Sequence, residues 1–252
     1  MSEPFSHYDL TSARQHGRPG REIRPKSLTV DIRSHAQVPG AVEVVRGHLS
    51  ADPHAGFYTE ETRVSGTKQT ADRTPYLIDL DLRMRTFDDM GVGAQVISPS
   101  FPQPQRFSKH YFSNVIGNPL DTTMALHWLI FDGVLERYPD LKIIAAHGGG
   151  YLPTHSGRID HAWGAPSGSR GTLPNSPGFY LKKIYFDTIV FTAHQLEAMV
   201  KLFGVDQILL GTDYPYDMGE YDPIGHIAAV ECLSPSDVAA IAGGNAKRLF
   251  GI

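Results

Sequence analysis

The sequence predicts an α/β protein in which helices cover a parallel β-sheet. Short runs of aliphatic and β-branched residues alternate along the chain with longer segments whose apolar residues recur every three or four positions. Polar or glycine-rich residues follow these short runs rather than precede them. Because parallel strands present their carboxyl ends at one edge of a sheet, we expect the functional side chains to gather at that edge.

Five of the short runs are predicted to be strands, since each is mostly apolar and ends in polar residues or glycine. Their positions along the chain are 28–32, 95–98, 141–146, 183–187 and 207–211. An open sheet of parallel strands has two unpaired edges, so we expect other segments or a partner chain to cover them.

Five segments are predicted to be helices from the spacing of their apolar residues. Their positions are 39–49, 77–90, 119–137, 194–203 and 236–249. Gly91 is expected to end the second of these helices. Asp121 is the expected N-cap of the third, and either Ser234 or Ser236 is the expected N-cap of the last.

The remaining segments lack periodicity. Residues 1–27 mix proline, glycine and scattered charges and are predicted to form a flexible arm. The polar stretch 50–75 and the Gly/Pro-rich stretch 164–178 are predicted to be irregular. Residues 28–252 are expected to form a single domain.

The composition excludes several classes of protein. The chain has 252 residues, of which 41% are hydrophobic and 20% charged, as in ordinary globular proteins rather than disordered ones. With 23 basic and 27 acidic residues the net charge is -4, so no basic field is available to attract nucleic acid. The single cysteine, Cys232, excludes an internal disulfide and a thiolate metal cluster.

The sequence also predicts where the protein resides. It has no run of about 18 apolar residues, the length that a transmembrane helix requires. The N-terminal segment lacks the apolar stretch of a signal peptide. We therefore expect a soluble, unprocessed cytoplasmic protein that binds neither membranes nor nucleic acid.

His147 directly follows the third predicted strand and precedes three glycines. Glycines at a strand end let a ligand approach the backbone closely, and an imidazole there is suited to act as a base or a metal ligand. The alternative is that the glycines only permit a tight turn, which His147 caps.

Asp213 follows the fifth predicted strand in the same way. A carboxylate at this position is suited to bind a cation or to hold a histidine. The alternative is an Asx-turn before Pro215.

Two arginines and a histidine complete the set of candidates. Arg33 and His35 are two positions apart on the first strand, so their side chains point to the same side. Taken alone, His35 is expected to be structural. Arg158 is expected either to reach an anionic substrate or to pair with Asp160. Other histidines are expected to be solvated or in the core, namely His110, His127, His155, His161 and His194.

Five motifs together suggest a family. They are QRF at 105–107, HGGG at 147–150, GRIDHAW at 157–163, GTDYP at 211–215 and GNA at 244–246. With these motifs the chain resembles the aminocarboxymuconate-semialdehyde decarboxylase branch of the amidohydrolase superfamily over nearly everything after residue 27. The resemblance implies a (β/α)8 barrel of the TIM type, a divalent metal (zinc or manganese), and non-oxidative decarboxylation of unsaturated or aromatic acids.

The resemblance also implies roles for individual residues. His35 and Asp213 match metal ligands of the family, and His147 matches its catalytic histidine, which moves protons. Arg158 matches an arginine that, in the dimers of this family, reaches the substrate carboxylate of the neighbouring subunit. Arg73 matches a second substrate-binding arginine. A small carboxylic acid and a second copy of the chain are therefore the expected partners.

The chain departs from the family pattern in two respects. Arg33 stands where the family has the first histidine of its metal-binding HxH motif, so a ligand position is lost. Near 99–104 only a short Pro-rich link replaces about three β/α units, so we expect an incomplete barrel with five of the eight strands. We hypothesise that Arg33 forms an ion pair with Asp213 in place of the metal.

Three functions remain open from the sequence. The first is a metal-dependent carboxy-lyase of an unsaturated or aromatic acid. The second is a hydrolase of the same superfamily that cleaves an amide or a lactone. The third is a non-catalytic, truncated homologue that associates with related chains.

Overall fold

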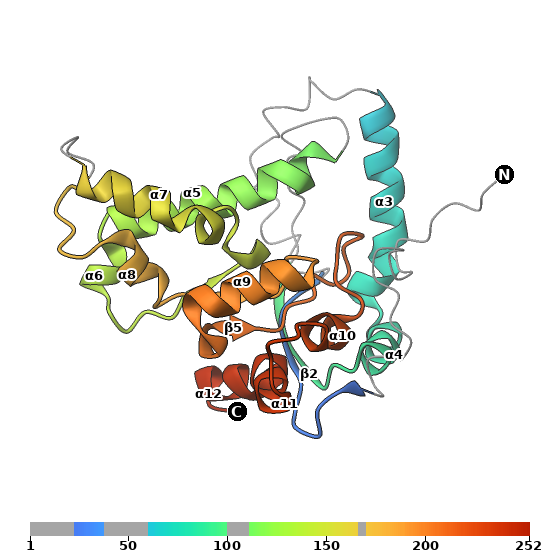
Figure 1. Ribbon diagram of the computed structural model, residues 1–252. Helices are drawn as coiled ribbons and strands as arrows, with labels where there is room; N and C mark the ends of the chain where they lie inside the picture. The colour runs from blue at the N-terminus through green and yellow to red at the C-terminus, as the bar shows by residue number, and fades with distance from the viewer. Residues whose placement is uncertain (1–22, 38–59, 100–110, 166–169) are drawn as a thin grey trace.

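The computed structural model describes residues 23–37, 60–99, 111–165 and 170–252 (Figure 1). In this part of the chain the strands are β1 (Val30–Ala36), β2 (Ala94–Pro99), β3 (Ile144–Ala145), β4 (Tyr185–Asp187) and β5 (Ile208–Leu209). All the paired strands run parallel, with β1 beside β2 and with β4 between β3 and β5. The prediction of a parallel α/β protein is therefore confirmed.

Backbone contacts beyond β5 connect the two sheets. Ile32 N donates to Leu210 O at 2.9 Å, and His35 N donates to Tyr214 O at 2.6 Å. The backbone thus connects the strands in the order β2, β1, β5, β4 and β3. This arrangement brings residues from both ends of the chain to the same edge.

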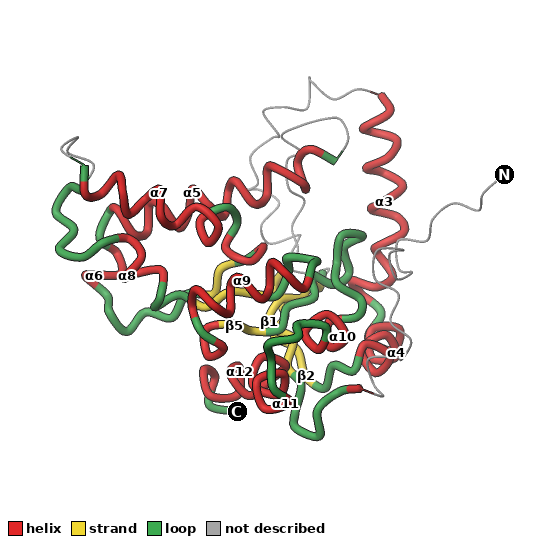
Figure 2. Tube along the Cα trace, viewed as in Figure 1, coloured by secondary structure: helices red, strands yellow, loops and turns green. Residues whose placement is uncertain are grey.

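Helices surround these strands (Figures 1 and 2). The helices are α3 (Glu60–Ile78), α4 (Leu80–Met90), α5 (Asn118–Phe131), α6 (Val134–Arg137), α7 (Leu152–Gly164), α8 (Pro177–Leu181), α9 (Ala193–Phe203), α10 (Pro223–Ala228), α11 (Pro235–Ala239) and α12 (Asn245–Phe250). Single turns of π-helix, η2 (Ser113–Gly117) and η5 (Ala240–Gly244), and of 3-10 helix, η3 (His147–Gly149) and η4 (Val205–Gln207), adjoin them.

The core joins the strands to the helices on their faces. Phe186 of β4, Leu196 of α9, Ile208 of β5 and Ile227 of α10 have fully buried side chains in it. Asn245, from the GNA motif, donates to Val205 O in η4 and to Ile208 O at the start of β5, at 2.8 Å each. Helix α12 is therefore hydrogen-bonded directly to the strand that leads into the site.

Helix α3 contradicts the prediction of an irregular segment at 50–75. Its sequence is polar and contains Gly66 and Pro75, so it lacks the apolar periodicity by which a helix is recognised. Tertiary contacts hold its C-terminal end, where Gln37 N donates to Leu77 O at 3.1 Å and Tyr76 packs against the core. Helix α4 then begins after Asp79, which caps it, and ends at Gly91 as predicted.

The predicted helix at 119–137 is wrong in two details. It begins at Asn118, so Asp121 lies within the first turn and is not the N-cap. It also breaks into α5 and α6 at Gly133, whose φ of 69° lies in the left-handed region that glycine favours. Helix α9 confirms the prediction at 194–203, whereas α7, α8 and α10 were not expected.

Some expectations fall on residues outside the described part. These are most of the arm at 1–27, the helix at 39–49, the link at 99–104 except Pro99, the motif at 105–107 and His110. Within the described residues, no helix combines the length and apolar character needed to cross a bilayer.

The helix predicted at 236–249 is divided into α11, η5 and α12, and α11 is capped by Ser234 rather than by Ser236. Ser234 Oγ accepts from Asp237 N, and Asp237 in turn accepts from Ser234 N. Replacing Ser234 with alanine is expected to lower the free energy of unfolding by about 1 kcal/mol, because the helix loses its N-cap. Ser236→Ala is the control, with an expected loss below about 0.5 kcal/mol, and equal losses in urea titrations would contradict this assignment.

Candidate active site around Arg33

Four strand ends place charged and polar side chains at one edge. Arg33 and His35 lie on β1, and His147 follows β3. Asp187 is the last residue of β4, and Asp213 follows β5. The structure thus brings together the four candidates predicted there and adds Asp187, which the sequence analysis did not select.

Arg33 is the centre of this group, and its side chain is 15% exposed. Its Nη1 donates to Asp187 Oδ2 at 3.0 Å. Its Nη2 lies 3.1 Å from Asp213 Oδ1 and 3.0 Å from His147 Nε2. The hypothesised ion pair between Arg33 and Asp213 is therefore confirmed, and the guanidinium bridges two carboxylates and an imidazole.

His147 is held as a neutral base. A guanidinium donates hydrogen bonds and cannot accept them, so His147 Nε2 is the acceptor and its proton resides on Nδ1. That nitrogen lies 2.9 Å from Thr122 Oγ1 and donates to it. Burial, and then the charge of Arg33, lowers the pKa of His147 to about 4.

His35 supports the same carboxylate from the other side. Its Nε2 lies 3.0 Å from Asp213 Oδ1, and its ring meets Tyr216 edge-on with the ring centroids 4.9 Å apart. Burial by itself raises the pKa of Asp213, but the charge of Arg33 and the hydrogen bond from His35 outweigh it, so the pKa lies below its ordinary value. Asp213 is therefore a carboxylate at neutral pH.

Asp187 is the residue that sequence reasoning missed. Its side chain is fully buried, and it accepts from His147 N at 3.0 Å and Gly148 N at 2.6 Å as well as from Arg33. It therefore fixes both the guanidinium and the loop that carries His147. An acidic residue ending a buried strand is the same signal that selected Asp213 and could have found Asp187.

The backbone of two site residues is strained. His147 has a φ of 54° and Asp213 a φ of 58°, in the left-handed region that residues other than glycine rarely adopt. Neither residue simply completes an ordinary turn, because each side chain contacts residues far away in the chain. Such strain persists where the surrounding structure enforces it, as at functional sites.

Asp31 ties the first strand to the loop that carries Asp213. Its buried carboxyl accepts from Thr212 Oγ1 at 2.5 Å, from Thr212 N at 3.0 Å and from Gln95 Nε2 at 2.9 Å. Burial raises the pKa of Asp31 to about 7, against the opposing effect of these hydrogen bonds. Asp31 therefore holds β1, which carries Arg33, next to the loop that carries Asp213.

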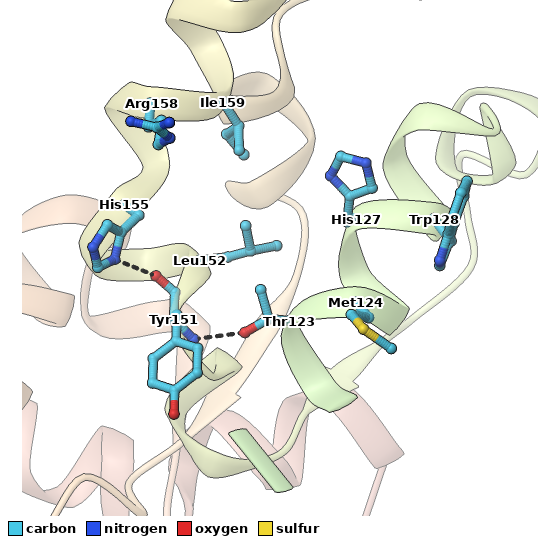
Figure 3. A pocket seen from close by; sticks show the side chains of 9 residues that line it. All are labelled: Thr123, Met124, His127, Trp128, Tyr151, Leu152, His155, Arg158 and Ile159. Carbon is cyan, nitrogen blue, oxygen red and sulfur yellow. Dashed lines mark hydrogen bonds between the residues drawn. The ribbon is translucent and has the colours of Figure 1, made fainter. Parts of the chain in front are cut away.

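Arg158 lies in a different place from the Arg33 group. It is exposed on α7 and lines a cavity of about 490 Å³ between α7 and α5 (Figure 3). Asp160 does not pair with it but accepts from Gly178 N at 2.7 Å. The other residues lining the cavity are Thr123, Met124, His127, Trp128, Tyr151, Leu152, His155 and Ile159. Among the described residues, none of the side chains that contact Arg33 through a hydrogen bond or an ion pair lines this cavity.

Arg73 lies at the rim of the site. It extends from α3, and its guanidinium carbon is 4.9 Å from the centroid of the Tyr216 ring, which in turn contacts His35. The structure therefore places Arg73 next to the Arg33 group through one aromatic side chain. Other histidines behave as expected, since His155, His161 and His194 are exposed and His127 is half-buried.

The residues present do not fit a divalent metal ion. His35 and Asp213, the expected ligands, are hydrogen-bonded to each other, and Arg33 Nη2 lies between Asp213 and His147. Among the described residues, no group of three or more histidine, cysteine, aspartate or glutamate side chains is arranged to hold a metal. A cationic side chain at the centre also repels a dication.

Parallel strands that bring histidine and aspartate to their carboxyl ends are typical of barrel-type α/β proteins, and they form the candidate site of this chain. The family model for amidohydrolases matches residues 45–252. The chain belongs to the amidohydrolase family, and its resemblance to the aminocarboxymuconate-semialdehyde decarboxylase branch is confirmed by its relatives.

Two relatives carry that enzyme's name. The 2-amino-3-carboxymuconate-6-semialdehyde decarboxylase of Dictyostelium discoideum is 34% identical over 148 residues, 58% of this chain and 41% of that protein. The Caenorhabditis elegans protein of the same name is 28% identical over 148 residues, 58% of this chain and 37% of that protein. The chain therefore matches only 37–41% of the length of these relatives.

Solved structures of decarboxylases share the fold. The 5-carboxyvanillate decarboxylase of Novosphingobium aromaticivorans, complexed with manganese and a nitrobenzoic acid, has a TM-score of 0.71 at 14% identity and covers 90% of this chain and 97% of its own. The dihydroxybenzoic acid decarboxylase of Polaromonas, with manganese and 2-nitroresorcinol, has a TM-score of 0.66 at 16% identity and covers 89% and 97%. These similarities establish a TIM-barrel-type amidohydrolase fold.

Proposed function

We propose that this chain acts on a small unsaturated or aromatic carboxylic acid and replaces its carboxyl group with hydrogen, in the manner of non-oxidative decarboxylases. The observation that carries the proposal is the convergence of Arg33, His35, His147 and Asp213 at one edge of the strands. The relatives support the substrate class, because those named are mostly decarboxylases of such acids.

The reaction sets two tasks for the side chains of the site. The carbon–carbon bond to the carboxyl group breaks, CO2 leaves with neither of the bonding electrons, and the remaining carbon takes up a proton. Arg33 supplies positive charge near the electrons left behind, and His147, neutral before the reaction, is suited to take up a proton from solvent water and deliver it to the carbon. Arg73, at the rim beside Tyr216, is placed to attract the substrate carboxylate.

Incubation of the purified chain with 2,6-dihydroxybenzoate, 5-carboxyvanillate or aminocarboxymuconate semialdehyde tests this proposal. We expect release of CO2 and loss of the substrate's ultraviolet absorbance, and we expect at least about a 100-fold loss of rate in His147→Gln, because the proton-moving group is removed. Arg85→Gln, an exposed change on α4, is the control. Absence of turnover by folded wild-type protein on all three substrates would contradict the proposal.

A second candidate is a non-catalytic homologue that associates with related chains. The specific observation in its favour is that Asp187 and Asp213 already neutralise Arg33, which weakens its attraction for a substrate anion. The same assay separates the candidates: a folded chain without turnover that co-purifies with a full-length decarboxylase would support this second function. The hydrolase alternative gains no comparable support, because the relatives described above are named as decarboxylases.

The incomplete barrel and the dimer are part of the proposal. The described residues contain five parallel strands, and β2 and β3 each have only one strand partner there. A second copy of the chain that covers such edges would satisfy their backbone groups. Light scattering on the purified protein is expected to give the mass of a dimer, and a stable monomer at micromolar concentration would contradict it. We also propose a cytoplasmic location, as the sequence predicts.

A further inference from the structure

We infer that the guanidinium of Arg33 is the resident cation of this site and that this one side chain keeps a divalent metal ion out. The inference deepens the proposed function by naming the cation of the site. The experiment that tests this inference measures bound metal and does not require turnover, so the inference and the proposed function can fail separately.

The first argument is spatial. Asp187 Oδ2, Asp213 Oδ1 and His147 Nε2 all point to the terminal nitrogens of Arg33, at 3.0 to 3.1 Å. A metal ion bonded to the same atoms would lie about 2.0 to 2.2 Å from each. The volume between these three acceptors is therefore already occupied by the guanidinium.

The second argument concerns charge. Arg33 is buried against two carboxylates, Asp187 and Asp213, which hold its pKa above the ordinary value despite its burial, so it keeps its proton. A dication in contact with this permanent charge would be repelled in a site with little water to screen it. The metal would also have to break the ion pairs before it could bind.

The third argument is that the surrounding donors would suit a metal if the guanidinium were absent. His35 and Arg33 lie on the same side of β1, and His147 and Asp213 lie within hydrogen-bond distance of Arg33. Arg33→His would replace the cation with an imidazole beside His35, His147 and Asp213. Four nitrogen and oxygen donors of this kind are the usual complement of a zinc site.

The test compares metal content in three proteins after chelation and reloading with Zn²⁺ or Mn²⁺. Wild type is expected to retain well below one equivalent, whereas Arg33→His is expected to retain about one equivalent and to gain thermal stability when the metal is added. Arg85→His, which adds a histidine at an exposed site on α4, is the matched control and is expected to behave like wild type. Circular dichroism reports whether each variant is folded.

Two outcomes would overturn the inference. One is a wild-type protein that holds one equivalent of metal and loses it in His35→Ala. The other is a folded Arg33→His protein that stays free of metal, because Arg33 would then not be what excludes it. If Arg33→His fails to fold, one equivalent of metal in the wild type, lost in His35→Ala, would still overturn the inference.

Discussion

Replacing Arg33 with methionine is expected to lower the free energy of unfolding by about 3–5 kcal/mol, the usual cost of removing one partner of a buried ion pair. The loss is this large because Asp187, which is fully buried, and Asp213 would face each other without a cation. His147 would also lose the donor to its Nε2. Urea titration at neutral pH measures the difference.

Two control substitutions separate the loss of the buried charge at Arg33 from the effect of an arginine-to-methionine exchange in general. Arg85→Met, at an exposed position, is expected to change the free energy of unfolding by less than about 0.5 kcal/mol. Arg33→Lys is expected to fall between methionine and wild type, because one ammonium cannot present the planar fork that reaches Asp187, Asp213 and His147 together. A loss below about 1 kcal/mol in Arg33→Met would show that the ion pairs do not hold the strand ends together.

Replacing Gly150 with alanine is expected to cost about 2–5 kcal/mol, from backbone strain and overpacking together. Gly150 has a φ of 67° and a ψ of -132°, a conformation open almost only to glycine. An added Cβ would also lie 2.3 Å from Pro119 O and 2.6 Å from Thr123 Oγ1, so α5 would have to move. Thermal and urea unfolding both report the loss.

Gly157→Ala provides the matched control for this prediction. Gly157 lies in α7, and no atom outside its surroundings in the helix comes within 4 Å of the position that an added Cβ would take. Alanine there is expected to be neutral or to stabilise the protein by up to about 1 kcal/mol, because it favours the helix. Equal losses of stability in Gly150→Ala and Gly157→Ala would show that Gly150, the last glycine of the HGGG motif, has no special backbone role.

The sequence by itself was sufficient for the features that depend on local patterns. The alternation of strands and helices and the end of α4 at Gly91 follow from periodicity and from glycine's freedom to adopt a left-handed turn. Arg33 and His35 share one side of β1 because side chains alternate along a strand. With the family motifs, this was enough to predict the pairing of Arg33 with Asp213.

Contacts across the chain decided the remaining features. Asp187 joins Arg33 from 154 positions away and Thr122 joins His147 from 25 positions away, and no local pattern encodes either contact. Helix α3 forms from a polar sequence because its C-terminal end docks on the fold. Arg158 faces a separate cavity because α7, which the sequence did not predict, carries it there. Local sequence therefore determined which residues reach the strand ends, and only tertiary packing decided which of them meet, because their hydrogen bonds join distant segments.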